Sequence, residues 1–292
     1  MSPPRCLGAS STGAAPRWCW AGVLALALQA CGSTPQRPPS AAQAQAAASS
    51  ERAAKAAQRG DWRLAEQQYQ AALQTAVALQ DPSRTGAALL GLAQASARLG
   101  DPAAAHGHLD RLLADPSGID PGQRARAAAR KALLILDSGA PADARRWIDQ
   151  AGRDCAAPCA LAALLGNLRA HLALAQDDAA GAAAQAQAAG AAAAAAGQAG
   201  EQAAALRLQA RAAGLQGRHA EAAEALVLAL QIDRQLGEPD RIALDLTLAG
   251  EAEDRRGQAA AATRFYQRAL AVYSAIGDAA NAALLRQRLA GR

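Results

Sequence analysis

Loops that cannot continue a helix recur along this chain at a nearly constant interval, and that interval constrains the fold more than any other feature. Counted from the first residue of each loop, which we call the anchor, successive loops lie 40, 39, 38, 40 and 40 residues apart. A period of roughly 20–50 residues is typical of solenoids and other repeat arrays, in which each unit buries its apolar face against the next. The loops are Gly60-Asp61, Gly100-Asp101, Gly139-Ala140, Asp177-Asp178, Gly217-Arg218 and Gly257-Gln258.

Residue types at fixed distances from the anchors repeat as well. Small residues stand seven positions before and five positions after each anchor, as two helices that pack closely across a tight turn require. The position nine residues after the anchor is larger in five of the six units, and we expect it to wedge against a neighbouring helix. The three columns are Ala53, Ala93, Ala132, Ala170, Ala210 and Gly250; then Ala65, Ala105, Ala144, Ala182, Ala222 and Ala262; then Tyr69, Leu109, Ile148, Ala186, Leu226 and Tyr266.

The composition favours helices throughout. Hydrophobic residues make up 51% of the chain but aromatic residues only 3%, so alanine and leucine must supply most of the core. Alanine has the highest helix propensity, and β-branched residues, which favour strands, are sparse. The fold class predicted from the residues is therefore all-α.

The pattern resembles the tetratricopeptide repeat, in a subclass whose period is longer than the usual one of about 34 residues. The resemblance covers residues 49–292 and implies a right-handed alpha-alpha superhelix of about six helix pairs that binds other proteins. A lone helix over residues 279–289 is expected to cap it. Ala249 departs from the family, which has leucine there. The matching positions are Gly250, Gly257, Ala262, Tyr266 and Ala269-Leu270 in the last unit, and Gly60-Asp61-Trp62, Ala65, Tyr69 and Ala72-Leu73 in the first.

The fourth unit departs most from the repeat. Residues 179–200 are almost wholly Ala, Gly and Gln, and Ala186 leaves the wedge position without a bulky side chain. Two interpretations stay open. The second helix of this unit packs unusually close to its neighbours, or the segment is a flexible low-complexity stretch.

The first thirty residues have the pattern of an export signal. Arg5 and Arg17 precede a short apolar run, Trp18–Leu28, which is too short to span a bilayer. The run ends in Leu-Gln-Ala-Cys, which resembles the lipobox of bacterial lipoproteins. That resemblance implies cleavage after Ala30 and acylation of Cys31, and the absence of aspartate at the next position favours the outer membrane. An ordinary secretory signal is the alternative.

These features divide the chain into three parts. Residues 1–30 are interpreted as a signal peptide, residues 31–48 as the acylated cysteine and a flexible tether, and residues 49–292 as the repeat domain. Several prolines shortly after Cys31 are consistent with an extended tether. The expected location is the periplasmic face of the outer membrane, with anchoring through the lipid.

Two cysteines remain in the repeat domain. Cys155 and Cys159 are separated by three residues, and a pair of cysteines in an oxidising compartment is most simply a disulfide. Two free thiols, or a metal or redox role, are the alternatives. The spacing lacks the two intervening residues of thioredoxin-like sites, and no second Cys or His pair with zinc-ligand spacing stands nearby.

The sequence offers no constellation for catalysis. It lacks a phosphate-binding loop, a nucleophile elbow and a His-Glu-x-x-His motif, and its net charge is only +5 without a long basic run. We therefore expect no enzymatic activity, no cofactor, no metal, no nucleic acid and no small-molecule substrate.

The predicted function is a membrane-anchored periplasmic scaffold or adaptor for protein or peptide partners in envelope complexes such as pilus, secretin, barrel or cell-wall machinery. An accessory subunit or regulator of a cell-wall enzyme is the alternative. In the family that the repeat resembles, positions ten and six before each anchor face the concave groove. Here these are Asn167, His171, Arg207, Arg211, Thr247 and Glu251 in the last three units, and Ser50, Ala54, Leu90, Gln94, Ala129 and Leu133 in the first three.

Within this set, Arg207 and Arg211 lie four residues apart, on one helical face. They are the predicted grip for a partner's carboxylate, because a guanidinium binds a carboxylate through two parallel hydrogen bonds. A merely solvated charged face is the alternative.

Overall fold

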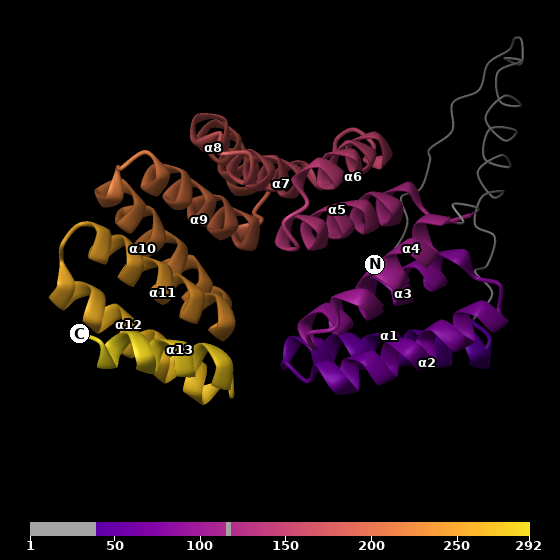
Figure 1. Cartoon of the computed structure of the whole chain (residues 1–292). Coiled ribbons are helices and arrows are strands. Elements are labelled where there is room, and N and C mark those ends of the chain that lie inside the picture. Colours follow the sequence, from indigo (N-terminus) through magenta and orange to yellow (C-terminus); the bar gives the residue numbers. More distant parts are fainter. Residues whose placement is uncertain (1–38, 115–117) are drawn as a thin grey trace, which may run out of the picture. The chain divides into compact units, whose positions relative to one another are not determined.

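The computed structural model describes residues 39–114 and 118–292. Within these ranges every regular element is an α-helix, and the helices follow one another as antiparallel neighbours in chain order (Figure 1). Residues Ala41–Arg292 form one compact unit. The helices are α1 (Ala41–Gln58), α2 (Trp62–Ala78), α3 (Pro82–Arg98), α4 (Pro102–Ala114), α5 (Pro121–Asp137), α6 (Pro141–Asp154), α7 (Ala162–Ala175), α8 (Ala179–Ala195), α9 (Ala199–Leu215), α10 (His219–Leu236), α11 (Pro239–Arg255), α12 (Ala259–Ala275) and α13 (Ala279–Ala290).

The architecture is the predicted one, a right-handed superhelix of helix pairs with a C-terminal cap. Each pair joins an odd-numbered first helix to an even-numbered second helix, and α13 packs against α12 at the end. Successive first helices also contact one another from α1 to α9. An exposed ion pair between Arg98 and Asp240 joins α3 to α11.

The six anchors end the first helices in the way that the sequence predicts. Every anchor has a positive φ, and the next residue's N–H bonds back to a carbonyl five residues earlier, as Ala140 does to Ile135 at 3.1 Å. This arrangement is the Schellman motif, in which a residue with positive φ, usually glycine, ends the helix. Asp177 adopts the same conformation at φ 59° without being glycine, which aspartate tolerates better than most residues.

Aspartate side chains then start many of the following helices. Asp61 and Asp178 each accept a hydrogen bond from the backbone N–H three residues on, at 3.1 and 2.8 Å. Such a cap satisfies one of the free N–H groups of the first turn. The paired residues of a Gly-Asp loop thus have separate tasks, since the first ends one helix and the second begins the next.

Five of the six wedge positions are buried as expected, and Tyr69 is partly buried. Tyr266 is fully buried and its ring lies against Gly250, where an added Cβ would come within 2.5 Å of Cε1. Tyr69 lies in the same way against Gly91 of the following helix, also at 2.5 Å. At these two positions only glycine leaves room for the aromatic ring. The wedge side chain can pack against the preceding helix, as Tyr266 does, or against the following one, as Tyr69 does.

The Ala/Gly-rich fourth unit is helical and closely packed. α8 runs from Ala179 to Ala195 and buries Ala186 and Ala189 completely or nearly so. An added Cβ at Gly166 of α7 would lie 2.8 Å from the Cβ of Ala189. The small side chains thus let α8 approach α7 closely, in agreement with the first of the two interpretations.

One predicted boundary needs correction. Residues 41–48, expected to belong to the tether, form the beginning of α1, in which Ala46 and Ser49 are buried. Alanine and glutamine have high helix propensity, so helix formation costs little free energy in this segment. Packing against α2 stabilises the helix. The signal-peptide and Cys31 predictions, and the rest of the tether before residue 39, lie outside the described residues.

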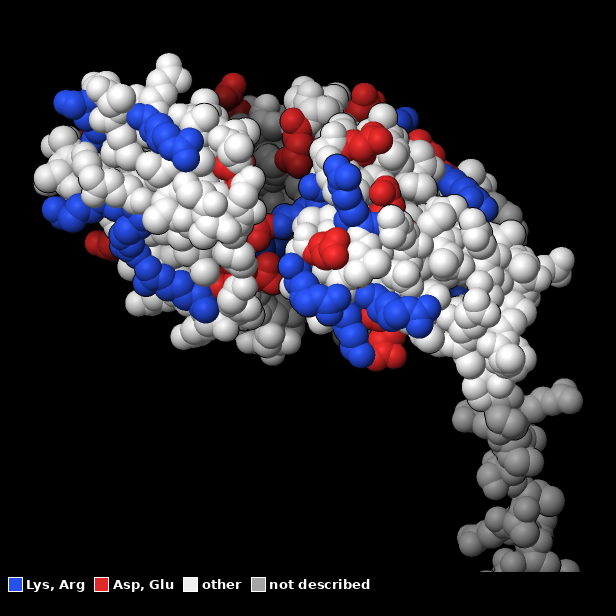
Figure 2. Space-filling view, turned by 90° about the horizontal axis from the view of Figure 1, so that it is seen from below, with Lys and Arg blue, Asp and Glu red and all other residues white. Residues whose placement is uncertain are grey.

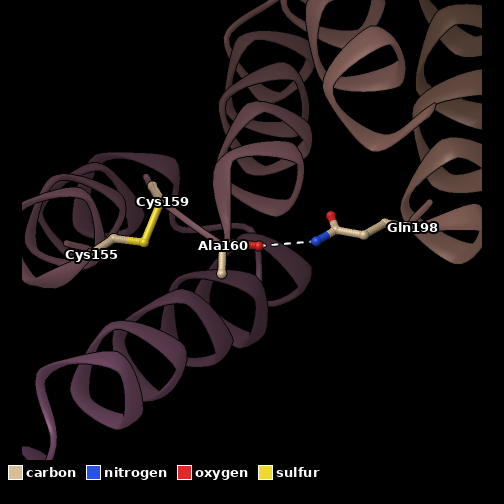
Figure 3. Close-up of a disulfide and its surroundings, with 4 residues drawn as sticks. All are labelled: Cys155, Cys159, Ala160 and Gln198. Carbon is tan, nitrogen blue, oxygen red and sulfur yellow. Dashed lines mark hydrogen bonds between the residues drawn. A yellow bond between two sulfur atoms is a disulfide. The ribbon is translucent and has the colours of Figure 1, made fainter. Parts of the chain in front are cut away.

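Cys155 and Cys159 form a disulfide, as predicted, with Cα atoms 5.3 Å apart (Figure 3). The bridge closes the connection between the end of α6 and the start of α7. The carbonyl of Ala160 in this connection accepts a hydrogen bond of 3.0 Å from Nε2 of Gln198, which precedes α9. The disulfide and this hydrogen bond together tie the third, fourth and fifth units at one end of their helices.

Candidate functional site

A pocket of about 770 Å³ opens on the first-helix side of the last units. From α1 to α9, successive first helices pack directly on one another, but α9 and α11 make little close backbone contact. Side chains of α9 and α11 form the walls of the pocket and α10 contributes to its base. Its apolar lining includes Leu208 and Leu215 from α9, Leu226 from α10, and Leu244 and Leu248 from α11.

Four of the six groove residues predicted in the last three units line this pocket, namely His171, Arg207, Arg211 and Glu251. Thr247 instead lines a neighbouring hollow of about 520 Å³, which Glu251 shares and α13 helps to form. Asn167 lies elsewhere. Its side chain is buried, and its amide donates to the backbone carbonyl and the carboxylate of Glu201 at 3.0 and 2.9 Å.

Arg207 is committed to two buried carboxylates. Its Nη1 donates to Asp233 of α10 at 2.5 Å and to Asp245 of α11 at 3.1 Å, and both aspartates are fully buried. This cluster therefore connects three helices beside the pocket. One guanidinium faces two carboxyl groups, and Oδ1 of Asp233 and Oδ2 of Asp245 have no protein donor among the described residues.

The surplus carboxyl affects the pKa of Asp245. Burial raises the pKa of Asp245 to about 7, with the neighbouring Asp233 adding to the effect and Arg207 opposing it. The cause is that a buried second negative charge is poorly compensated. A proton on Asp245 would restore charge balance with Arg207.

The acidic side chains at the pocket each have a basic partner. Glu251 accepts a hydrogen bond of 2.6 Å from Nη1 of Arg288, and Asp254 pairs with Arg292. Burial alone would raise the pKa of Asp254, but hydrogen bonds from Arg292 and from the hydroxyl of Tyr266 outweigh it and lower the pKa. Charges of both signs are also interleaved across the middle of the face in Figure 2.

Arg211 and Arg255 differ from these residues. Both are exposed, both line the pocket, and neither makes an ion pair or hydrogen bond within the described part of the chain. Arg211 does influence His171, whose pKa is lowered first by burial and further by this positive charge, while Asp137 opposes the shift. The pocket therefore holds two guanidinium groups that have no acidic partner among residues 39–114 and 118–292.

The sequence did not single out several of the residues that make this pocket. Arg255 and the leucines at 215, 244 and 248 fall outside the groove positions of the resembled family. A signal was present, since Leu244, Leu248 and Arg255 follow helical spacing on one face of α11. Whether these side chains line one pocket together depends on how far α9 and α11 diverge, and the spacing of the loops does not specify that distance.

The first three units present fewer polar groups at the predicted groove positions. Leu90 and Ala129 are buried, whereas Leu133 is 40% exposed. Gln94 accepts a hydrogen bond of 3.0 Å from Arg130. Ser50 is partly buried and Ala54 exposed on α1.

Two features are absent from the described residues. Residues 39–114 and 118–292 contain no group of three or more His, Cys, Asp or Glu side chains placed to hold a metal ion. Among the helices of the same ranges, none is both long and apolar enough to cross a bilayer.

Comparison with known proteins establishes the fold. No protein-family model matches the sequence, and no curated protein matches it at a significant level. The crystal structure of BtubC (BKLC) from P. vanneervenii is similar with a TM-score of 0.53 and 17% identity, covering 82% of this chain and 93% of that one. PilW, described as a widely conserved type IV pilus biogenesis factor, is similar with a TM-score of 0.55 and 18% identity, covering 82% and 97%. The chain thus has the fold of a tetratricopeptide-like helical solenoid.

Proposed function

We propose that the protein is a lipid-anchored scaffold of the periplasmic face of the outer membrane, which recruits a protein partner into an envelope complex through the pocket between α9 and α11. The observation that carries the binding role is the pocket itself. It has an apolar lining, lies on the first-helix side, and includes four of the residues that the repeat pattern predicts to face the groove. Apolar side chains gathered and exposed in a groove mark a surface that binds other proteins.

The envelope setting rests on separate grounds. The Leu-Gln-Ala-Cys sequence after a short apolar run supports acylation of Cys31. The Cys155–Cys159 disulfide is consistent with an oxidising compartment. The likeness to PilW, a pilus biogenesis factor by its description, supports a role in envelope assembly without selecting the complex. The proposed function is binding and involves no catalysis.

Acylation is tested by feeding cells labelled palmitate. We expect label on the wild-type protein, none on Cys31→Ala, and recovery of the wild type with the outer membrane. Equal labelling of the two proteins, or none on either, would refute the anchor.

Partner binding is tested by photocrosslinking in living cells. A photoreactive amino acid replaces Leu215 at the pocket, or Gln267 on the exposed side of α12 as the matched control. We expect one envelope protein, identified by mass spectrometry, to be crosslinked from position 215 and not from position 267. Crosslinking from both positions alike, or from neither, would contradict binding in the pocket.

A further inference from the structure

The chemistry of the pocket indicates what kind of segment it accepts. Its acidic groups are already matched, since Glu251 pairs with Arg288 and Asp254 with Arg292. Arg207 is likewise occupied by the two buried aspartates. The charge that remains available to a ligand is therefore positive, and it belongs to Arg211 and Arg255.

The same pocket exposes apolar side chains that the fold does not cover. Leu215 is 58% exposed and Leu244 is 40% exposed, and both line the pocket. Removing the exposed part of a leucine side chain from water favours binding in proportion to the apolar area that is covered. An occupant that covers these leucines thus gains a substantial part of its binding free energy from apolar contact.

Each wall carries both kinds of group. On α9, Arg211 and Leu215 lie four residues apart and share one helical face. On α11, Leu244 and Arg255 lie eleven residues apart, which is close to three turns, and so share a face as well. Each wall therefore offers a leucine and an unpaired guanidinium to whatever lies between the walls.

From this arrangement we propose that the pocket binds a short segment of a protein partner in which apolar side chains, leucine-like in size, are flanked by carboxylates. The apolar side chains cover Leu215 and Leu244, and the carboxylates pair with Arg211 and Arg255. This inference rests on the proposed function, because it specifies the partner of the same site. Electrostatic complementarity of this kind supplies specificity and a faster encounter.

The chain's own N-terminal segment lacks this chemistry. Residues 1–38 include Arg5, Arg17 and Arg37 but no aspartate or glutamate, so they offer no side-chain carboxylate to the pocket. A second copy of the chain does carry this chemistry, since exposed Glu224 and Leu228 lie four residues apart on α10. The proposal commits to a different protein, and the test separates the two.

The test uses the full-length protein and three short fluorescent peptides. The first alternates leucine with glutamate, the second replaces each leucine with alanine, and the third replaces each glutamate with lysine. Fluorescence anisotropy measures their affinities for the wild type, for the double variant Arg211→Gln/Arg255→Gln, and for Arg264→Gln. Arg264 is an exposed arginine of α12 that does not line the pocket and makes no ion pair within the described residues.

We expect the leucine-glutamate peptide to bind the wild type at least about tenfold more tightly than the other two peptides. The double variant should lose about tenfold or more in affinity for this peptide and should lose the salt dependence of binding, while Arg264→Gln behaves as the wild type. Circular dichroism checks that helicity is unchanged. Equal affinity for the three peptides, or an unaffected double variant, overturns the proposal.

Two further outcomes are informative. Concentration-dependent self-association of the wild type that the double variant abolishes would identify a second copy as the occupant and overturn the proposal. If a partner is crosslinked from position 215 in cells while the leucine-glutamate peptide does not bind, the proposed function stands and the acidic-apolar partner does not. The failures of the two proposals are therefore distinguishable.

Discussion

Replacing Asp245 with asparagine tests the electrostatic account of the cluster beside the pocket. Asparagine has nearly the same shape, its carbonyl can still accept from Arg207, and its amide can donate to Asp233, as a protonated Asp245 would. The variant therefore removes the surplus negative charge while keeping the hydrogen bonds. We expect Asp245→Asn to be more stable than the wild type at neutral and alkaline pH.

The magnitude and sign follow from the pKa of about 7 in the folded protein against the ordinary value of 3.8. Between these values the folded protein holds a proton that the unfolded chain has lost, so wild-type stability falls as pH rises. One unit of pKa corresponds to about 1.4 kcal/mol, and the full shift to about 4 kcal/mol as an upper limit. The loss is complete above about pH 7 and absent below about pH 4.

Urea unfolding followed by circular dichroism measures this, with hydrogen exchange of α9–α11 as a local readout. Asp245→Asn should exceed the wild type by about 2–4 kcal/mol near pH 8 and approach it near pH 4. Asp149→Asn, at an exposed site of α6 without an ion pair in the described residues, should show no such difference. The reasoning is refuted if Asp245→Asn is less stable near pH 8, or if its difference from the wild type does not change with pH.

Three further predictions concern stability and are each measurable by denaturant unfolding or thiol titration. Gly250→Ala should destabilise the last unit by about 1–3 kcal/mol, because the new Cβ would lie 2.5 Å from the ring of Tyr266; an unchanged midpoint would contradict the wedge. Gly107→Ala, in α4 with no heavy atom within 4 Å of the new Cβ, should instead stabilise by about 0.5–1 kcal/mol, and destabilisation would contradict the helix assignment. The denatured, unreduced protein should have no free thiol at Cys155 or Cys159, and reduction should cost at most about 2 kcal/mol because the closed loop is short.

The repeat was predictable because its signals are local. The anchors set helix ends through backbone conformation, and the small residues around them permit helix contact, so the loops alone indicate pairs of helices in order. The helical state of residues 41–48 was missed because prolines shortly before them suggested a tether. The fourth unit could not be decided from sequence, since alanine favours a helix by itself, but whether that helix packs closely depends on neighbours such as Gly166 that let it approach.

The site was predictable only in part. Four of the predicted groove residues line the pocket, and whether a partner binds there stays a prediction. Which charged side chains form ion pairs could not be predicted from the sequence, because Asp233 and Asp245 reach Arg207 from two other helices. Along the sequence, these aspartates look like ordinary charges on solvated helix faces, and only the packing of α9, α10 and α11 buries them.

The ion pairs of Arg207 decide which arginine can be substituted to test ligand binding. Arg207 and Arg211 stand on the same face of α9, and the sequence treated them as one carboxylate grip. Removing the Arg207 guanidinium would leave two buried carboxyl groups uncompensated, and breaking a buried pair in this way costs about 3–5 kcal/mol. A variant at Arg207 would therefore lose partner binding through damage to α9–α11 whether or not the side chain touches a ligand. Arg211 is exposed and has no acidic partner in the described chain, so its substitution changes the pocket's charge while leaving the helices' own contacts in place.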